Sequence, residues 1–320
     1  MNRIFSSLLV LLLVWAGDDR TVPRTLRVLT YNIHHGEGTD GRFDLSRLAG
    51  VMEDAQPDVV ALQEVDRDTE RSGGVDQLAE LERLTDMHGG FGKAMDFSGG
   101  SYGVAVLSRW PLLSTSNHPL PGSPDREPRT ALTVRLGSGD QGPLLQFTST
   151  HLDQGRDPED RLAQATSLNE LLVRDENQPA ILAGDMNSRP DTEVMEIFAA
   201  QWAMAPAVDP SPTNPSGRPR LRVDHVLFRP AESWRVLESR VIDDRVASDH
   251  RPVLIVLEWT GPRRVEAFSP PACSSTVTEL LRLRLAPTFA RDPRCGRDRP
   301  ESDKPRTSSR PNRAPSVAGS

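Results

Sequence analysis

The chain of 320 residues is 37% hydrophobic and 26% charged, proportions typical of a soluble globular protein that can bury one large core. Its formal net charge of −7 combines +6 in residues 261–320 with −13 in the first 260 residues, and so acidic a body disfavours a nuclease that grips long nucleic acid through many phosphates. The two cysteines, Cys273 and Cys295, both follow residue 261, which excludes a thiolate metal site from the body of the protein.

The N-terminus has the pattern of a secretory signal peptide. A charged start at Arg3 precedes an almost wholly apolar run, Ile4–Trp15, and Val14–Ala16 supplies a small-residue cleavage site. The run is short for a membrane span. We therefore expect residues 1–16 to be a signal peptide and the protein to be exported, to the periplasm or the exterior. An uncleaved N-terminal membrane anchor and a misassigned start codon are the alternatives.

From Leu26 onwards, strand and helix patterns alternate. Short apolar runs predict strands, and leucines at helical spacing predict helices, the first with Asp44 as its N-cap. The first half is expected to contain a strand at Leu26–Tyr31, a helix at Asp44–Ala55, a strand at Val59–Leu62, a helix at Asp76–Met87 and strands at Phe91–Met95, Tyr102–Ser108, Ala131–Leu136 and Leu144–Thr150.

The second half continues with the same alternation. Its expected elements are a helix at Pro158–Arg174, a strand at Ile181–Gly184, a helix at Val194–Trp202 and strands at Val223–Phe228, Trp234–Ile242 and Val253–Trp259. This order predicts an α/β fold with two facing, mainly antiparallel sheets covered by helices, in one domain spanning 25–260.

The pattern breaks after Trp259. Residues 261–320 contain nine prolines and many Arg and Ser residues, with one short apolar patch at Leu280–Leu285. This composition predicts a disordered tail. A small independent module and an out-of-frame extension are the alternatives, and the segment carries no identifiable chemistry.

The most informative stretch is Ile181–Asn187, in which four apolar or small residues run into Gly184 and then present Asp185 and Asn187. A buried strand that ends in this way delivers a carboxylate and a carboxamide to the carboxyl edge of a sheet, where such folds hold ligands. Taken alone, the segment is equally consistent with a strand followed by a polar turn.

Three other strand-end motifs strengthen the functional interpretation: Thr30–Asn32, Leu62–Glu64 and Ser248–His250. Hydrolysis of a phosphoester requires neutralised phosphoryl charge, an activated water and a stabilised leaving oxygen. Carboxylates that hold a hard divalent cation meet the first requirement. Glu64 and Asp249 suit the role of metal ligand, whereas Asp66 and Asp68, which follow Glu64, are expected to lie solvated in a loop.

The remaining tasks have candidates of their own. Asp185 could accept a proton from the attacking water, and His250 could donate to a phosphoryl oxygen if Asp224 keeps it oriented or charged. Asn187 and Asn32 could donate to phosphate or hold the metal shell, and His151, which closes an apolar strand, points a donor at the same edge. Each motif alone is weak evidence, because structural histidines and exposed carboxylates are common.

As a set, these motifs resemble the endonuclease/exonuclease/phosphatase (DNase I-like) superfamily. The motifs that carry the resemblance occur in chain order as Tyr31–Asn32, Gln63–Glu64, Ser101–Arg109, Thr150–Leu152, Gly184–Asn187, Val223–Asp224 and Ser248–His250, and the match covers roughly residues 26–259. The resemblance implies a four-layer α/β sandwich and a Mg²⁺ or Mn²⁺ site. It implies Glu64 as principal metal ligand with Asn32 and Asp249 near the metal, and Arg129 as a basic residue on a strand near the phosphate. The roles that it implies for the other residues match those above: Asp185 on the water, Asn187 and His151 on the phosphoryl group, and Asp224 paired with His250.

Two departures bear on the substrate. His34 stands where abasic-site endonucleases carry an acidic residue, and the Asp224 motif reads Val-Asp-His rather than the frequent Asp-Tyr. The acidic body, the export signal and the compact length favour a phosphoesterase acting on a small or lipid-linked phosphodiester or monoester. A secreted or periplasmic nuclease is the alternative, and it would need Arg42, Arg67, Arg71 and Arg126 on the rim of the site. A binding module that has lost catalysis is a third possibility. No obligate protein partner is indicated, and a monomer is expected.

Overall fold

A computed structural model of the protein describes residues 25–137, 145–173, 178–205 and 211–261. The chain divides into two compact units, and all described residues belong to the first, Met1–Ser269. The predicted signal segment at 1–16 and the predicted tail, apart from Gly261, lie outside the described residues. Over the part that is described, no helix is long and apolar enough to cross a membrane.

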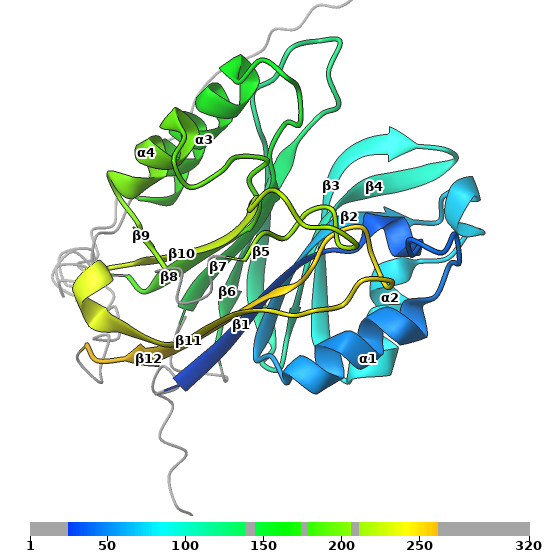
Figure 1. Ribbon diagram of the computed structural model, residues 1–320, viewed down its shortest axis with the longest axis horizontal. Coiled ribbons are helices and arrows are strands. Elements are labelled where there is room, and N and C mark those ends of the chain that lie inside the picture. The colour runs from blue at the N-terminus through cyan, green and yellow to red at the C-terminus, as the bar shows by residue number, and fades with distance from the viewer. Residues whose placement is uncertain (1–24, 138–144, 174–177, 206–210, 262–320) are drawn as a thin grey trace, which may run out of the picture. The chain divides into compact units, whose positions relative to one another are not determined.

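Twelve described strands form two sheets of six (Figure 1). The first sheet has the order β11-β12-β1-β2-β4-β3. Its strands are β1 (Thr25–Asn32), β2 (Val59–Arg67), β3 (His88–Phe97), β4 (Gly100–Ser108), β11 (Trp234–Val241) and β12 (Val253–Trp259). The second sheet has the order β5-β6-β7-β8-β10-β9. It contains β5 (Leu112–Pro119), β6 (Thr130–Leu136), β7 (Leu145–His151), β8 (Ala180–Asp185), β9 (Ala203–Met204) and β10 (Asp224–Arg229).

The sheets pack face to face and helices cover their outer faces. Residues such as Val28, Val59, Phe147 and Ile181 form one apolar core between the two sheets. Helices lie on both outer sides of this pair of sheets (Figure 1). A second cluster buries α1 (Leu45–Ala55) and α2 (Gln77–Thr85) against the first sheet, and a third buries α3 (Glu159–Leu172) and α4 (Glu193–Ala199) against the second. The predicted four-layer α/β sandwich is therefore confirmed.

Central strands are apolar on both faces because both faces are covered. Val28 on β1 faces the core between the sheets, whereas its neighbour Leu29 packs with the residues of α1 and α2. The first helix begins as predicted, since the side chain of Asp44 accepts a hydrogen bond from the backbone N–H of Arg47. Asp76 caps α2 in the same way through the N–H of Ala79.

Several boundaries differ from the sequence-based expectation. The pattern gave no sign of β5, because most of this edge strand is exposed and its residues 114–117 are all polar. The two-residue strand β9 was also not predicted. The second strand, expected to end at Leu62, continues to Arg67 across an irregularity between Leu62 and Val65.

The expectation that Asp66 is solvated is wrong. Asp66 lies in β2 with a side chain that is 0% exposed. Its carboxylate accepts hydrogen bonds from Nε and Nη2 of Arg71 and from the hydroxyl of Thr69. Arg71 also stacks over the ring of Phe97, 4.5 Å from its centroid. A buried carboxylate of this kind is retained because a guanidinium neutralises it and hydrogen bonds satisfy it. Asp68 is exposed, as predicted.

Gly184 fixes the spacing between β7 and β8. These strands pair in parallel with Thr150 opposite Gly184, and a Cβ added at Gly184 would lie 2.0 Å from the carbonyl oxygen of Thr150. Gly184→Ala is therefore expected to lower the free energy of unfolding by about 2–3 kcal/mol, because the two strands must move apart. Urea denaturation measures this change.

Gly50 in α1 provides the matched control, because a Cβ there would meet no atom within 4 Å. Gly50→Ala should raise the free energy of unfolding by about 0.5–1 kcal/mol, since Ala is the better helix former. Equal effects of the two substitutions would show that the close approach at Gly184 is unimportant.

Candidate active site

The sheet registers bring the predicted residues to one end of the sandwich. In the first sheet β1 and β2 are parallel, with Asn32 opposite Gln63. In the second sheet Asp185 lies opposite His151 of β7 and opposite Asp224 of β10. The two edges meet directly, because the side-chain amide of Asn32 donates to Asp185 Oδ2 at 3.3 Å.

Glu64 sits at the point where β2 is irregular. It has a left-handed backbone with φ of 58°, and its Oε1 accepts a hydrogen bond from Asn32 Nδ2 at 2.9 Å. A non-glycine residue in this conformation is under backbone strain, and such residues cluster at functional sites. The irregularity turns the Glu64 carboxylate toward Asn32, and it could not be located from the apolar pattern of the strand.

Asp185, His250 and Asp224 form a buried cluster. Asp224 Oδ2 accepts a hydrogen bond from His250 Nδ1 at 3.0 Å, so the pairing expected from the sequence is present. On the other side of the ring, His250 Nε2 lies 3.7 Å from Asp185 Oδ2. No hydrogen-bond partner among the described residues reaches the buried Oδ1 of Asp224. The cluster therefore has two carboxylates for one imidazole.

Burial and charge shift the pKa values of this cluster in defined directions. Burial, together with the charge of Asp224, raises the pKa of Asp185 to about 7. Burial alone would lower the pKa of His250, but the carboxylates of Asp224 and Asp185 outweigh it and raise the pKa to about 10. At neutral pH the imidazole is therefore protonated, and Asp185 is close to its midpoint of ionisation. This pairing of an acid and a base is typical of catalytic sites.

His151 occupies a contrasting environment. Its Nδ1 accepts a hydrogen bond from the guanidinium of Arg129 at 3.0 Å, because a guanidinium can only donate. Burial and the charge of Arg129 hold the pKa of His151 well below its usual value. The ring is therefore neutral with its proton on Nε2, which lies 3.5 Å from Asp185 Oδ2. Arg129 itself is buried and lies 2.8 Å from a carboxylate oxygen of Glu127.

Asn187 is held by the turn that follows β8. Its backbone N–H donates to Asp185 Oδ1 at 2.8 Å, and its φ of 46° is left-handed. The side-chain amide of Asn187 also donates to the carbonyl of Leu152 at 3.0 Å. His225, in the unusual Val-Asp-His motif, is a structural histidine: it is buried, and its Nε2 donates to the carbonyl of Ser188 at 2.9 Å.

Two groups of side chains could hold a cation within the described part of the chain. Each contributes three ligand atoms that lie within 4.8 Å of one another: Asp185, Asp224 and His250 in one group, and His34, His35 and Glu64 in the other. In the first group His250 is protonated, so both of its ring nitrogens carry hydrogens and only the two carboxylates could ligate a cation. In the second group a carboxylate and two imidazoles are available, and such donors fit a divalent cation.

Asp249, which was predicted to be a metal ligand, belongs to neither group. Its carboxylate lies 3.5 Å from the hydroxyl of Ser248, and its charge contributes to the raised pKa of His250. The sequence did not single out His34 and His35 as ligands. Their adjacency to Asn32 in the Asn-Ile-His-His-Gly segment was the available signal.

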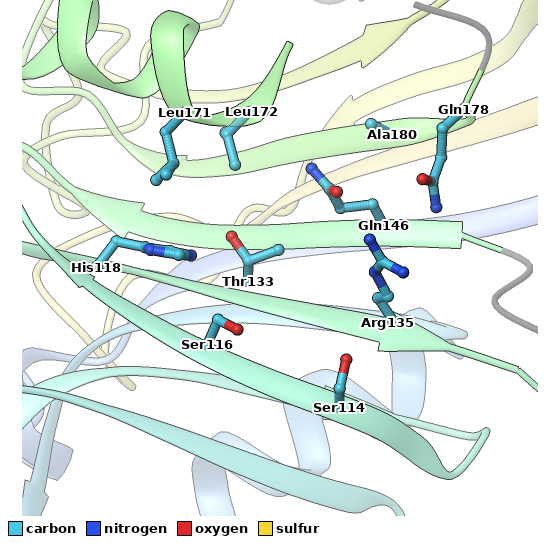
Figure 2. Close-up of a pocket in the computed structure, with 10 residues that line it drawn as sticks. All are labelled: Ser114, Ser116, His118, Thr133, Arg135, Gln146, Leu171, Leu172, Gln178 and Ala180. Atoms are coloured by element: carbon cyan, nitrogen blue, oxygen red, sulfur yellow. The ribbon is translucent and has the colours of Figure 1, made fainter. Parts of the chain in front are cut away.

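One hollow of the described surface lies away from these two groups. It has a volume of about 230 Å³ and is lined by Ser114, Ser116, His118, Thr133, Arg135, Gln146, Leu171, Leu172, Gln178 and Ala180. Figure 2 shows side chains of β5, β6 and β7 together with Gln178 and Ala180 at the start of β8, and Leu171 and Leu172 at the end of α3 beside them. None of its lining residues belongs to either cluster, so this hollow is not part of the candidate active site.

Two six-stranded sheets between helices, with carboxylates, amides and histidines gathered at one edge, define the DNase I-like class of phosphoesterases and nucleases. The chain belongs to the endonuclease/exonuclease/phosphatase family, whose model matches residues 29–250. Members of this family are hydrolases that act on phosphoester bonds.

Solved structures agree with this assignment. An endonuclease/exonuclease/phosphatase from Beutenbergia cavernae is 29% identical, with a TM-score of 0.63 over 76% of this chain and 73% of that one. The mannosyl-6-phosphatase of Bacteroides thetaiotaomicron is 20% identical, with a TM-score of 0.59 over 73% of this chain and 100% of that one. The catalytic domain of human Nocturnin, solved with a bound sulfate, is 20% identical, with a TM-score of 0.58 over 75% and 96% of the two chains. At 20% identity, the last two establish a shared fold.

Proposed function

We propose that this protein is a divalent-metal-dependent phosphoesterase in which Asp185 activates the attacking water. The observation that carries the proposal is the Asp185–His250–Asp224 cluster, in which a protonated imidazole adjoins a carboxylate whose pKa is about 7. A group with a pKa near the working pH is well suited to accept a proton from water. The protonated imidazole of His250 beside it can stabilise negative charge on the phosphoryl group at the same time.

Glu64 and Asn32 would hold Mg²⁺ or Mn²⁺, with Asp249 near the ion. When bound, the cation would supply positive charge to the phosphoryl oxygens. The hydrogen bond from Asn32 to Glu64, at 2.9 Å, supports this role because it orients the carboxylate in advance.

The remaining residues position and stabilise the phosphoryl group. His250 donates a hydrogen bond from its Nε2–H to a phosphoryl oxygen, and Asp224 holds the ring by accepting a hydrogen bond from Nδ1. His151 is neutral and offers its Nε2–H, and Asn187, whose side-chain amide donates one hydrogen to the Leu152 carbonyl, offers the other. Arg129 keeps His151 in that tautomer. Asp185 takes the proton from the water as its oxygen attacks phosphorus. The bond from phosphorus to the leaving oxygen breaks with its electron pair on that oxygen, which then takes a proton from solvent.

We propose a small or lipid-linked phosphodiester or monoester as the substrate. Besides the acidic body, the state of the arginines supports this choice over a nucleic acid. Arg67 lies 2.6 Å from Asp76, and Arg71 lies 2.7 Å from Asp66, so both have internal partners. Long nucleic acid requires several arginines available to phosphates. The signal-like residues 1–16 support export, and we propose that the enzyme acts as a monomer.

Hydrolysis by the full-length purified protein tests the proposal. We expect turnover of bis-p-nitrophenyl phosphate, p-nitrophenyl phosphate or sphingomyelin with Mg²⁺ or Mn²⁺, exceeding turnover of supercoiled plasmid. EDTA should abolish it, and Glu64→Gln should lower it because the principal metal ligand is lost. Metal-independent turnover, or full activity in the variant, would contradict the assigned site. Plasmid as the best substrate would instead favour a nuclease.

A further inference from the structure

His34, His35 and Glu64 converge on one point beside the buried cluster. Each offers one ligand atom, and the three atoms lie within 4.8 Å of one another. All three residues are partly buried, and the side chain of His35 is 13% exposed. A small ion can therefore reach the group from solvent while the protein shields it from bulk water.

Glu37 holds both imidazoles through the nitrogens that a cation would not use. His34 Nδ1 lies 3.0 Å from the carbonyl oxygen of Glu37, and His35 Nε2 lies 3.3 Å from its carboxylate Oε2. Metal-binding histidines commonly donate their second ring N–H to a carbonyl or a carboxylate in this way. The buried Nδ1 of His35 has no hydrogen-bond partner among the described residues, which leaves it available as a ligand.

The backbone keeps the two rings in this arrangement at the cost of strain. His34 and His35 have φ angles of 46° and 44°, in the left-handed region that non-glycine residues avoid. The backbone N–H of His34 donates to Asn32 Oδ1 at 3.1 Å, and buried Gln77 donates to the carbonyl of His35 at 2.6 Å. Strain that is maintained by such specific contacts points to a functional constraint on the segment.

We propose that His34 and His35 join Glu64 in holding the divalent cation and shift the preference of that site from Mg²⁺ toward transition metals such as Mn²⁺, Co²⁺ or Zn²⁺. Imidazole ligands favour these ions, whereas Mg²⁺ prefers oxygen ligands and water. The inference rests on the proposed assignment of Glu64 as a metal ligand, and it names the class of cation that this residue helps to bind.

Cobalt binding to the metal-free full-length protein tests the site without substrate. We expect Co²⁺ to bind at one site with visible d–d absorption, resisting competition by excess Mg²⁺. Glu37→Gln should weaken binding roughly tenfold, because a ring loses its support. The double variant His34→Gln/His35→Gln should weaken it about 100-fold or more, since two ligands are lost. His88→Gln, which replaces an exposed histidine at the start of β3, should leave it unchanged.

An NMR spectrum of the wild-type protein tests metal binding without relying on variants that could fail to fold. With ¹⁵N-labelled histidine rings, one equivalent of Zn²⁺ should shift the resonances of His34 and His35 and leave that of His88 in place. Unchanged Co²⁺ affinity in the double variant, or Zn²⁺ shifts at other histidines only, would overturn the proposal. Asp224→Asn separates the two hypotheses: it should lower the rate of hydrolysis at pH 8 while Co²⁺ binding persists. Histidine-dependent Co²⁺ binding in a wild-type protein without hydrolytic activity would retain the metal site and reject the proposed function.

Discussion

Asp185→Ala is expected to lower kcat for phosphoester hydrolysis by a factor of about 10²–10⁴, the usual contribution of a positioned general base. The carboxylate that would take the proton from water is removed, whereas Asp224 and His250 remain as a paired carboxylate and imidazolium. Because that remaining pair has no net charge, the variant should keep its fold. Steady-state kinetics measures the loss, and circular dichroism checks the fold.

The pH dependence provides a second test of the same residue. The pKa of Asp185 is raised to about 7, so the wild-type rate should increase as Asp185 loses its proton. The acidic limb of the kcat/KM profile should lie at or below pH 7, since a bound divalent cation lowers the pKa of a nearby carboxyl group. This limb should be absent from the residual activity of Asp185→Ala.

Asp191→Ala is the matched control, because Asp191 lies six residues after Asp185 with a side chain that is 73% exposed. It should leave both the rate and the pH profile unchanged. A comparable loss in the two variants would mean that the region tolerates no substitution, and it would remove the assignment of Asp185 as the base.

The layered fold was predictable because its strands are covered on both faces. Such strands read as uninterrupted apolar runs, and Ile181–Gly184 and Val253–Leu257 are examples in which every residue is buried. The same rule explains the failure at β5, whose edge position leaves residues 113–117 exposed, with nothing to impose a pattern. Apolar periodicity records burial, and it carries no information about strands that remain at the surface.

The candidate site was only partly predictable, for a different reason. Residues such as Asp185 and Asn32 end regular strands, so their position along the chain already indicates the sheet edge. The position of Glu64 depends on an irregularity in β2, and those of His34 and His35 depend on left-handed backbone angles. Asp66 was misjudged because its partner, Arg71, lies beyond the strand in sequence. Contacts of this kind are decided by tertiary packing and leave no local periodicity.

Asp224→Asn is expected to change the pH range over which the enzyme works. In the wild type, burial opposes protonation of His250, but the two carboxylates raise its pKa to about 10, so the imidazolium persists through neutral pH. Removing the Asp224 charge removes the largest contribution that raises this pKa, and burial then lowers it. The variant should therefore lose activity as the pH rises from about 6 to 8, whereas the wild type retains its rate over that range.

His250→Gln supplies the reference for complete loss of the imidazolium. It should lower kcat by about 10²–10³-fold at every pH, the usual cost of removing one donor to a developing anion. The Asp224→Asn variant should resemble the wild type most closely near pH 6 and His250→Gln most closely above pH 8. Parallel profiles for Asp224→Asn and the wild type would contradict the role of Asp224 in keeping His250 charged.

The free energy of unfolding should also depend on the ionisation of His250, and should fall as His250 loses its proton. The pKa of His250 in the folded protein, about 10, lies above its ordinary value of 6.5, so the folded state binds this proton more tightly than the unfolded state does. The stabilisation is fully present below pH 6.5 and is lost as the pH rises toward 10. In urea denaturation of the metal-free protein, the deficit of His250→Gln relative to the wild type should therefore be largest near pH 6 and should shrink toward pH 10. A deficit that does not vary with pH would mean that the ring stabilises the fold by packing, and that the charge held between Asp224 and Asp185 contributes nothing to it.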